Sequence, residues 1–597
     1  MLLPCIFTTL FFALDIELFS LYNKAMNLLP WWKTRIAYQI YPRSFCDSNN
    51  DGIGDIPGII SKLDYLVELG VGILWLSPVY RSPNDDNGYD ISGYREINPE
   101  FGTMDDMKNL IAEAKKRGLK LVMDLVVNHT SDEHPWFQES RKSKDNPYRS
   151  YYIWQPGRTA KTGKKIPPNN WSSFFTGSAW EYDKTTDEYY LHLFSKKQPD
   201  LNYNNPDVIS AVKDIMTFWL DLGIDGFRCD VINVIFKTSL ANGKKRLALT
   251  GREWYHCQEG CHKILAELRR DVLSKYDCVA IGETVLVNTK QANELCASER
   301  KELDMVFSFE HVECDQINNK WFKLPFKPQK FMETIEKWQN ELDWNALYFE
   351  NHDQPRSVSR FGNKKYLIQS AKMLSMLLLT LRGTPFIYEG QELAMENGEF
   401  QDINEFQDIE SHKVWQIATN LHFPYWLKMK MLHRTSRDNA RTPMQWNNSK
   451  NAGFSPDETV KPWLKINSNK DYINVEAEKA DSNSVFNWYK KLILLRRNTP
   501  ELVGGKFKMI YKNRNIFAYQ RTLSEVAGVP EKKSIVVINF SGKKHSLPTE
   551  LKAALDSLGS SVVLCSVYEE TKNLPPYAAF IVRSATNKTD FNSSGEQ

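Results

Sequence analysis

The chain has 597 residues, 76 of them basic and 73 acidic, which gives a formal net charge of +3. This length excludes a single small domain, and the near balance of charge gives no reason to expect nucleic acid or an anionic membrane surface as a partner. The nine cysteines are an odd number, so no complete disulfide framework can be inferred, and we expect reduced thiols.

Residues 1–30 are expected to be an N-terminal extension that is not native in full, because Met26 would open the enzyme directly. Residues 2–14 are mostly apolar, but no basic residue precedes them, and Asp15 and Glu17 follow closely. The run is too short to span a membrane and lacks a small-residue cleavage site. We therefore expect a cytoplasmic protein without membrane association; export, with residues 1–25 acting as a leader, is the alternative.

From Arg35 onward, strand-like runs alternate with stretches of helical period. The expected strands are 37–41, 71–76, the runs that end at Asn128, Asp230 and Glu283, then 305–309, the run that ends at Glu350, and 386–388. Stretches of helical period at 105–117, 206–222 and 365–381 lie between them. Eight strands joined by crossover helices predict an α/β fold, a (β/α)8 TIM barrel, formed by residues 31–130 and 200–506.

Two further units are expected outside the barrel. Residues 131–199, between the third and fourth strands, are rich in aromatic, Asn, Pro and Gly residues and too long for an ordinary loop, which predicts a small inserted domain. A helix at 485–497 precedes short β-rich runs, which predict a small antiparallel β domain at 507–584. The polar tail 585–597 is expected to be disordered.

Two segments carry residue types that metals prefer. Residues 47–55 place oxygen ligands at alternating positions with glycines between them, like the first half of an EF-hand loop, and would suit Ca²⁺; the alternative is a polar turn. Residues 256–262 contain two cysteines and two histidines. No CxxC spacing or second Cys/His pair completes a zinc site there, so helix and turn residues are the favoured interpretation.

Polar side chains end four of the expected strands. Arg228 and Asp230 end one, Asn128 and His129 a second, Glu283 a third, and His352 and Asp353 a fourth. A buried structural ion pair is the alternative for Arg228 and Asp230. Because the carboxyl ends of parallel strands meet at one edge of the sheet, the recurrence predicts a shared site there.

These four runs resemble the four signature regions of glycoside hydrolase family 13, the α-amylase clan. Within the family, Gln-Pro-Asp-Leu-Asn at 198–202 is similar to a marker of the oligo-1,6-glucosidase and α-glucosidase branch. The resemblance extends from about Arg35 into the C-terminal region. It implies a glycosidase that acts on small oligosaccharides, and we expect a monomer.

The resemblance also implies a role for each strand-end residue. Asp230 would be the nucleophile, Glu283 the general acid and base, and Asp353 a third carboxylate that grips sugar hydroxyls in the transition state. Arg228 would keep Asp230 ionised. His129 and His352 would donate to the sugar, and cleavage would retain the anomeric configuration.

Further residues would shape the pocket. Asp90 and Arg441 match the pair that holds the terminal glucose in this branch, so cleavage should be exo-acting, while Tyr89 offers a stacking face and Phe194 a wall. In the resembling enzymes, valine after the nucleophile, here Val231, accompanies α-1,6 activity, although some α-1,4 activity can remain. The calcium ligands of the family would be Asp47, Asn49, Asp51 and Asp55 with the Ile53 carbonyl, in a structural role.

Related activities remain as alternatives. They are α-1,4-glucosidase, sucrose isomerase and trehalose-6-phosphate hydrolase. An isomerase-like Arg-Leu-Asp-Arg-Asp loop is absent after Glu283, and the phosphate-using branch has Gln-Ala-Asp where this chain has Gln-Pro-Asp. A non-enzymatic alternative is a transporter heavy chain, but those proteins have lost catalytic residues that this chain keeps.

Overall fold

The computed structural model describes residues 29–317, 319–525, 531–558, 561–566 and 573–584. The expectations for the N-terminal extension, apart from its last two residues, and for the tail 585–597 therefore lie outside the described residues.

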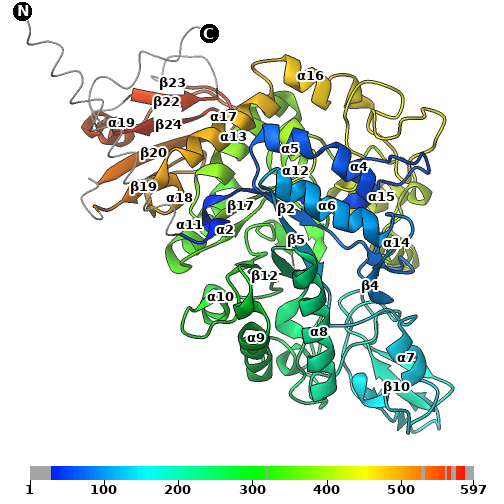
Figure 1. Ribbon diagram of the computed structural model, residues 1–597. Helices are drawn as coiled ribbons and strands as arrows, with labels where there is room; N and C mark the ends of the chain where they lie inside the picture. The colour runs from blue at the N-terminus through cyan, green and yellow to red at the C-terminus, as the bar shows by residue number, and fades with distance from the viewer. Residues whose placement is uncertain (1–28, 318, 526–530, 559–560, 567–572, 585–597) are drawn as a thin grey trace, which may run out of the picture.

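Eight parallel strands form a nearly closed barrel at the centre of the molecule (Figure 1). In chain order they are β1 (Ala37–Ile40), β2 (Ile73–Leu76), β5 (Lys120–Leu125), β11 (Gly226–Cys229), β12 (Val279–Glu283), β13 (Met305–Phe307), β16 (Ala346–Leu347) and β17 (Thr384–Tyr388). Seven neighbouring pairs share hydrogen bonds, and at the remaining junction the rings of Phe307 on β13 and Tyr348, just after β16, lie 5.3 Å apart. The predicted TIM barrel is confirmed.

Helices cover the outside of the barrel, as the crossover connections require. They include α6 (Met104–Lys116), α8 (Pro206–Leu222), α9 (Glu259–Asp271), α10 (Thr289–Cys296), α11 (Pro328–Glu341), α13 (Leu367–Thr380) and α17 (Val485–Arg497). The bounds of α8 follow from its ends: Asn205 caps the N-terminus, Pro206 opens the first turn, and Gly223 ends the helix at a φ of 111°. The helices predicted at 206–222 and 485–497 are confirmed.

The strands are buried on both sides, so they appear in the sequence as short continuous apolar runs. β16 is shorter than predicted, with two residues instead of five, because the chain leaves the ladder at Tyr348. The residues that follow carry polar side chains to the carboxyl end of the barrel instead of continuing the strand.

The insertion after β5 contains α7 (Pro135–Ser140) and a small antiparallel sheet of β6 (Trp154–Gln155), β10 (Glu188–Leu191) and β9 (Trp180–Asp183). In Figure 1 it lies at the lower right, beyond the carboxyl end of the barrel. Its two ends meet in a neck, where His129 pairs with Asp200 in a β-bridge. The buried ammonium of Lys237 lies 2.6 Å from the Asp200 carboxylate and 3.0 Å from Oδ1 of Asn128 at this neck.

The C-terminal part forms an antiparallel sheet in the order β18 (Lys506–Lys512), β19 (Ile516–Leu523), β20 (Lys532–Asn539), β24 (Ala579–Arg583) and β22 (Ser561–Cys565). The sheet was predicted, but helix α19 (Thr549–Ser557) was not. The sheet is held against the barrel by buried side chains such as Tyr519, whose hydroxyl lies 2.5 Å from that of Thr380 on α13.

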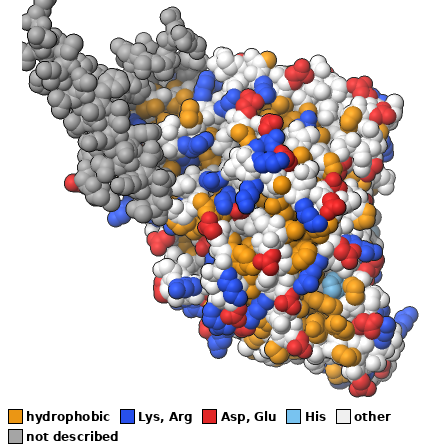
Figure 2. Space-filling view, viewed as in Figure 1, with side chains coloured by type: hydrophobic (Ala, Val, Ile, Leu, Met, Phe, Trp, Pro, Cys, Tyr) orange, Lys and Arg blue, Asp and Glu red, His pale blue; other side chains and the backbone are white. Residues whose placement is uncertain are grey.

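Charges of both signs are intermixed on the face shown in Figure 2, as the balanced composition leads one to expect. No helix within the described ranges has both the length and the apolar character needed to cross a membrane.

Candidate active site

A single guanidinium connects three carboxylates at the carboxyl end of the barrel. Arg228, on β11 and 1% exposed, donates from one nitrogen to Asp230 at 2.6 Å and to Asp124 at 2.7 Å, and lies 2.8 Å from Glu283 through the other. Asp230 directly follows β11, and Glu283 is the last residue of the neighbouring strand β12. The structure thus brings the predicted nucleophile and the predicted acid together. Asp124 was missed, because inside an apolar strand it offered no separate signal.

The two predicted catalytic carboxyl groups have different pKa values. Burial raises the pKa of Asp230 to about 6 and that of Glu283 to about 8, and in both cases the positive charge of Arg228 opposes the rise. Between these values Asp230 is ionised and Glu283 carries a proton. One group can therefore act as a nucleophile while the other acts as an acid.

Val231 has a backbone conformation that is unusual for a β-branched residue. Its φ is 35° and its ψ is 39°, in the left-handed region, which costs about 1–3 kcal/mol. In this conformation its backbone N–H donates to Oε2 of Glu283 at 3.1 Å. Its side chain is 5% exposed and packs in a hydrophobic cluster with residues of the insertion.

His352 and Tyr89 form the floor beside the carboxylates. Their rings stack at 5.3 Å, and the Tyr89 hydroxyl lies 2.7 Å from Nε2 of the imidazole. The Gln39 amide donates to Nδ1 at 2.7 Å, so the proton of the neutral ring lies on Nε2. Burial lowers the pKa of His352 to about 3, which keeps the ring neutral.

Asp353 is the most exposed of the three predicted catalytic carboxylates, with 30% of its side chain accessible against 10% for Asp230 and 8% for Glu283. Burial alone would raise its pKa, but the positive guanidinium groups of Arg437 and Arg441 hold that pKa below its ordinary value. Asp353 is therefore an anion throughout the neutral range, with an accessible side chain.

The two residues predicted to hold the terminal glucose, Asp90 and Arg441, bond to other partners and not to each other in the described hydrogen bonds, and their role toward a sugar stays a prediction. Asp90 is fully buried, and its carboxylate accepts the backbone N–H groups of Asp85 and Asp86 and the hydroxyl of Ser82. Arg441 instead donates to Asp353 at 2.7 Å and to the His352 carbonyl at 2.8 Å. The carboxylate of Asp90 is thus used to fold its own loop.

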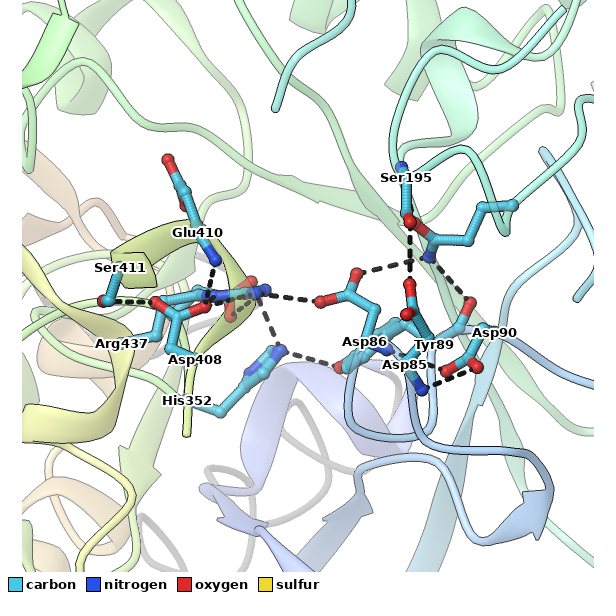
Figure 3. A network of polar contacts seen from close by, with 12 residues as sticks. Asp85, Asp86, Tyr89, Asp90, Ser195, His352, Asp408, Glu410, Ser411 and Arg437 are labelled. Atoms are coloured by element: carbon cyan, nitrogen blue, oxygen red, sulfur yellow. Dashed lines mark hydrogen bonds and ion pairs between the residues drawn. The ribbon is translucent and has the colours of Figure 1, made fainter. Parts of the chain in front are cut away.

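A different pair from the same two motifs meets here. Arg437 donates to Asp86 at 2.8 Å, and Figure 3 shows this contact spanning the space between the loop after β2 and the segment after β17. Arg437 also donates to the fully buried Asp408 at 2.7 Å, which caps α14 (Ile409–Asn420). Gln198 donates to the other oxygen of Asp86 at 3.2 Å. Asp86 and Arg437 each lie four residues before one of the predicted residues, Asp90 and Arg441.

Aromatic side chains of the insertion line the same region. Phe194 is half-buried and stacks on Phe174 at 4.8 Å, and its ring lies 5.3 Å from that of His129. Nε2 of His129 lies 3.1 Å from the Tyr89 carbonyl, and the ring is 2% exposed. The roles of Phe194 and His129 toward a sugar stay predictions.

The loop 47–55 is folded by hydrogen bonds within itself. Asp47 is fully buried and accepts the backbone N–H of Gly52 at 2.9 Å and the Ser455 hydroxyl at 2.6 Å. Asp55 caps the helix α4 (Ile56–Ser61) by accepting the Gly58 N–H. The other three predicted ligands complete the loop: Asn49 and Asp51 accept backbone N–H groups within it, and the Ile53 N–H is bound by Asp51.

No group of three or more His, Cys, Asp or Glu side chains in the described part of the chain is arranged to hold a metal. Calcium binding at 47–55 stays a prediction. In the segment 256–262, His262 pairs with Glu302 at 2.7 Å, whereas His256 bonds the Val285 carbonyl at 3.0 Å. The two imidazoles therefore have separate partners.

Comparisons with known proteins show which family this chain resembles. The family model described as "Alpha amylase, catalytic domain" matches residues 39–505. An oligo-1,6-glucosidase of Parageobacillus thermoglucosidasius is 53% identical over 526 residues, which cover 86% of this chain and 91% of that protein.

Solved structures of related enzymes have the same fold. The trehalose-6-phosphate hydrolase of Bacillus licheniformis matches with a TM-score of 0.85 and 41% identity over 93% of this chain and 100% of that one. The trehalulose synthase of Pseudomonas mesoacidophila matches with a TM-score of 0.84 and 40% identity over 93% of this chain and 99% of that one.

Proposed function

The chain belongs to the α-amylase family of glycoside hydrolases, and we propose that it is a retaining, exo-acting α-glucosidase that releases terminal α-1,6-linked glucose from isomaltose and short isomalto-oligosaccharides. The observation that carries this proposal is the pair of Asp230 and Glu283 at neighbouring strand ends, with pKa values of about 6 and about 8.

The chemistry follows from that pair. Asp230 attacks the anomeric carbon and forms a C–O bond with it as the glycosidic bond breaks, and Glu283 gives its proton to the departing oxygen. Glu283 then takes a proton from water as the water attacks the same carbon, and the bond to Asp230 breaks. Two inversions give net retention. Asp353, an accessible anion, binds sugar hydroxyls as positive charge develops on the ring.

The exo-action is proposed to depend on Asp86 and Arg437. Their ion pair at 2.8 Å joins two segments on opposite sides of the site, close to the stacked rings of Tyr89 and His352. Asp408 and Gln198 hold the two partners from behind. Such a pair would bind the terminal glucose and leave no room for a second unit beyond it.

The α-1,6 preference is supported by Val231 and by the relatives named oligo-1,6-glucosidase, which reach about half identity with this chain. Activity on α-1,4 links can accompany it, because one methyl group in a pocket is worth only about 1–3 kcal/mol. The trehalose-6-phosphate hydrolase of Bacillus subtilis is 43% identical, so hydrolysis of that substrate is the second candidate.

Three companion proposals complete the description. Calcium binds at 47–55 in a structural role, because three carboxylates, an amide and a carbonyl oxygen are hard donors that suit this ion. The chain acts as a monomer. It works in the cytoplasm, which is supported by buried, unbridged thiols such as Cys46, Cys229, Cys261 and Cys314.

The test is a comparison of initial rates on isomaltose, maltose, sucrose and trehalose 6-phosphate, with NMR identification of the first glucose anomer. The expected result is fastest turnover of isomaltose with α-glucose appearing first. Appearance of β-glucose first would contradict retention, and fastest turnover of trehalose 6-phosphate would replace the proposed substrate with the second candidate.

A further inference from the structure

One asparagine joins the loops that follow the two catalytic strands. The side-chain nitrogen of Asn233 donates to the Val285 carbonyl at 2.8 Å, and its side-chain oxygen accepts the Val285 N–H at 3.1 Å. Asn233 lies three residues after Asp230, and Val285 lies two residues after Glu283. The backbone N–H and the backbone carbonyl of Val285 are therefore both bonded to the side chain of Asn233 from the neighbouring loop.

We propose that Asn233 is a positioning residue, which fixes the separation and orientation of Asp230 and Glu283. The chain between it and Asp230 is short and ordered, because Ile232–Val234 form a turn of 3-10 helix. Val285 lies only two residues after Glu283 and Asn233 only three after Asp230, so a movement of Val285 relative to Asn233 would displace the two carboxylates. The inference rests on the proposed function, since it concerns the same pair.

Asn233 has no atom left for a substrate. The residue is fully buried, its side-chain oxygen is bound by Val285, and its side-chain nitrogen lies 3.5 Å from Sγ of Cys257 in addition to the Val285 carbonyl. Its own carbonyl accepts the Cys257 N–H at 2.9 Å. Asn233 therefore acts through other residues and not by touching the sugar.

A second side chain supports the same peptide more weakly. Nε2 of His256 donates to the Val285 carbonyl at 3.0 Å, but His256 makes no contact with the Val285 N–H in the described hydrogen bonds. Loss of His256 leaves both bonds of Asn233 in place. Substitution of His256 should therefore weaken the attachment of Val285 less than substitution of Asn233 does.

The hydrogen bond from Val231 to Glu283 makes the inference measurable. This N–H stabilises the ionised form of Glu283 and so lowers its pKa, against the larger effect of burial. If the two loops move apart, Glu283 loses this bond and part of the attraction of Arg228, which lowers its pKa more than Asp230 on the same loop raises it, so the pKa of Glu283 rises. The alkaline limb of the pH profile would then move to higher pH, which a loss of general stability alone would not produce.

The experiment compares wild-type enzyme, Asn233→Ala, His256→Phe and the control Asn539→Ala on p-nitrophenyl α-glucoside from pH 5 to 10. Asn539 is also fully buried and also binds backbone carbonyls of a neighbouring segment, but it lies in the C-terminal sheet. We expect Asn233→Ala to lower kcat by about 10- to 100-fold with little change in KM, because small misplacements of catalytic groups cost that much. Its alkaline limb should move upward, His256→Phe should show a smaller effect of the same sign, and Asn539→Ala should keep the wild-type kcat and limb.

Each outcome decides a separate point. Absence of turnover by the wild type would remove the proposed function and the inference with it. If the wild type is active and Asn233→Ala keeps the wild-type kcat, the inference alone is overturned. The same holds if Asn233→Ala lowers kcat but leaves the alkaline limb at the wild-type pH. If Asn233→Ala does not fold, a wild-type kcat and pH profile for His256→Phe would overturn it.

Discussion

The backbone N–H of Val231 donates a hydrogen bond of 3.1 Å to the carboxylate of Glu283. The residue after the predicted nucleophile thus holds the predicted acid, and it does so in a left-handed conformation that a β-branched residue rarely adopts. Its side chain meanwhile packs against the insertion. Val231 therefore connects the catalytic pair with the wall of the site.

Val231→Thr should shift the ratio of isomaltose to maltose activity towards maltose. Threonine keeps the β-branched shape and the backbone strain but adds a hydroxyl, which changes relative transition-state binding by about 1–2 kcal/mol, or about 5- to 30-fold in the ratio of kcat/KM values. The control is Val234→Thr, since Val234 is buried in the same cluster. An equal loss on both substrates would show that Val231 only packs the loop.

Asp230→Asn should abolish turnover and leave the fold intact. An amide cannot attack the anomeric carbon, while Arg228 keeps its contacts with Asp124 and Glu283. Activity on p-nitrophenyl α-glucoside and thermal melting are the two measurements. Glucose release near the wild-type rate would remove Asp230 from the mechanism.

The pH profile of kcat/KM should be bell-shaped. Asp230 must be ionised, so activity should fall as the pH drops below about 6, and Glu283 must be protonated, so activity should fall as the pH rises above about 8. The two limbs belong to the coupled pair and not to either group alone. A profile that stays flat from pH 5 to 9 would contradict this assignment.

Asp86→Asn should weaken binding of the terminal glucose, whereas Asp90→Asn should not. The first change removes a charged partner of Arg437, and a hydrogen bond to a charged group is worth about 1.5–3 kcal/mol, or about 10- to 100-fold in kcat/KM. The second changes a carboxylate that serves its own loop. The opposite ranking would restore Asp90 as the sugar-binding residue.

Removal of calcium should lower the melting temperature more than the activity at room temperature. A ligand that binds only the folded state stabilises it by about 2.7 kcal/mol at a concentration 100-fold above its Kd. The loop 47–55 contacts the segment near Ser455, so loss of calcium from the loop would loosen the contact between the two segments first. Melting with calcium and with EDTA, repeated on Asp51→Ala, is the measurement; identical curves for the wild type would indicate a metal-free turn.

The sequence predicted those features that depend on local pattern. The barrel strands, α8 and the polar strand ends follow from apolar runs, caps and positions that can be read along the chain. Arg437 and Asp86 could not be paired in this way, because they lie 351 residues apart and two alternatives stand four residues from them. Asp124 could not be predicted for a different reason. It lies within the buried part of an apolar strand, and its role depends on contact with Arg228, whose position is decided by the fold.

The neck of the insertion has a practical consequence for attaching probes. The bridge of His129 with Asp200 and the buried ammonium of Lys237 fix the base of the insertion. In the hairpin of β7 (Arg158–Thr159) and β8 (Lys165–Ile166), the turn between the strands is exposed, with open space around Gly163. Residues 160–164 are therefore the place to graft an affinity tag or a fluorophore, since a cargo there adds mass to a surface turn and leaves the connections to the catalytic pair untouched.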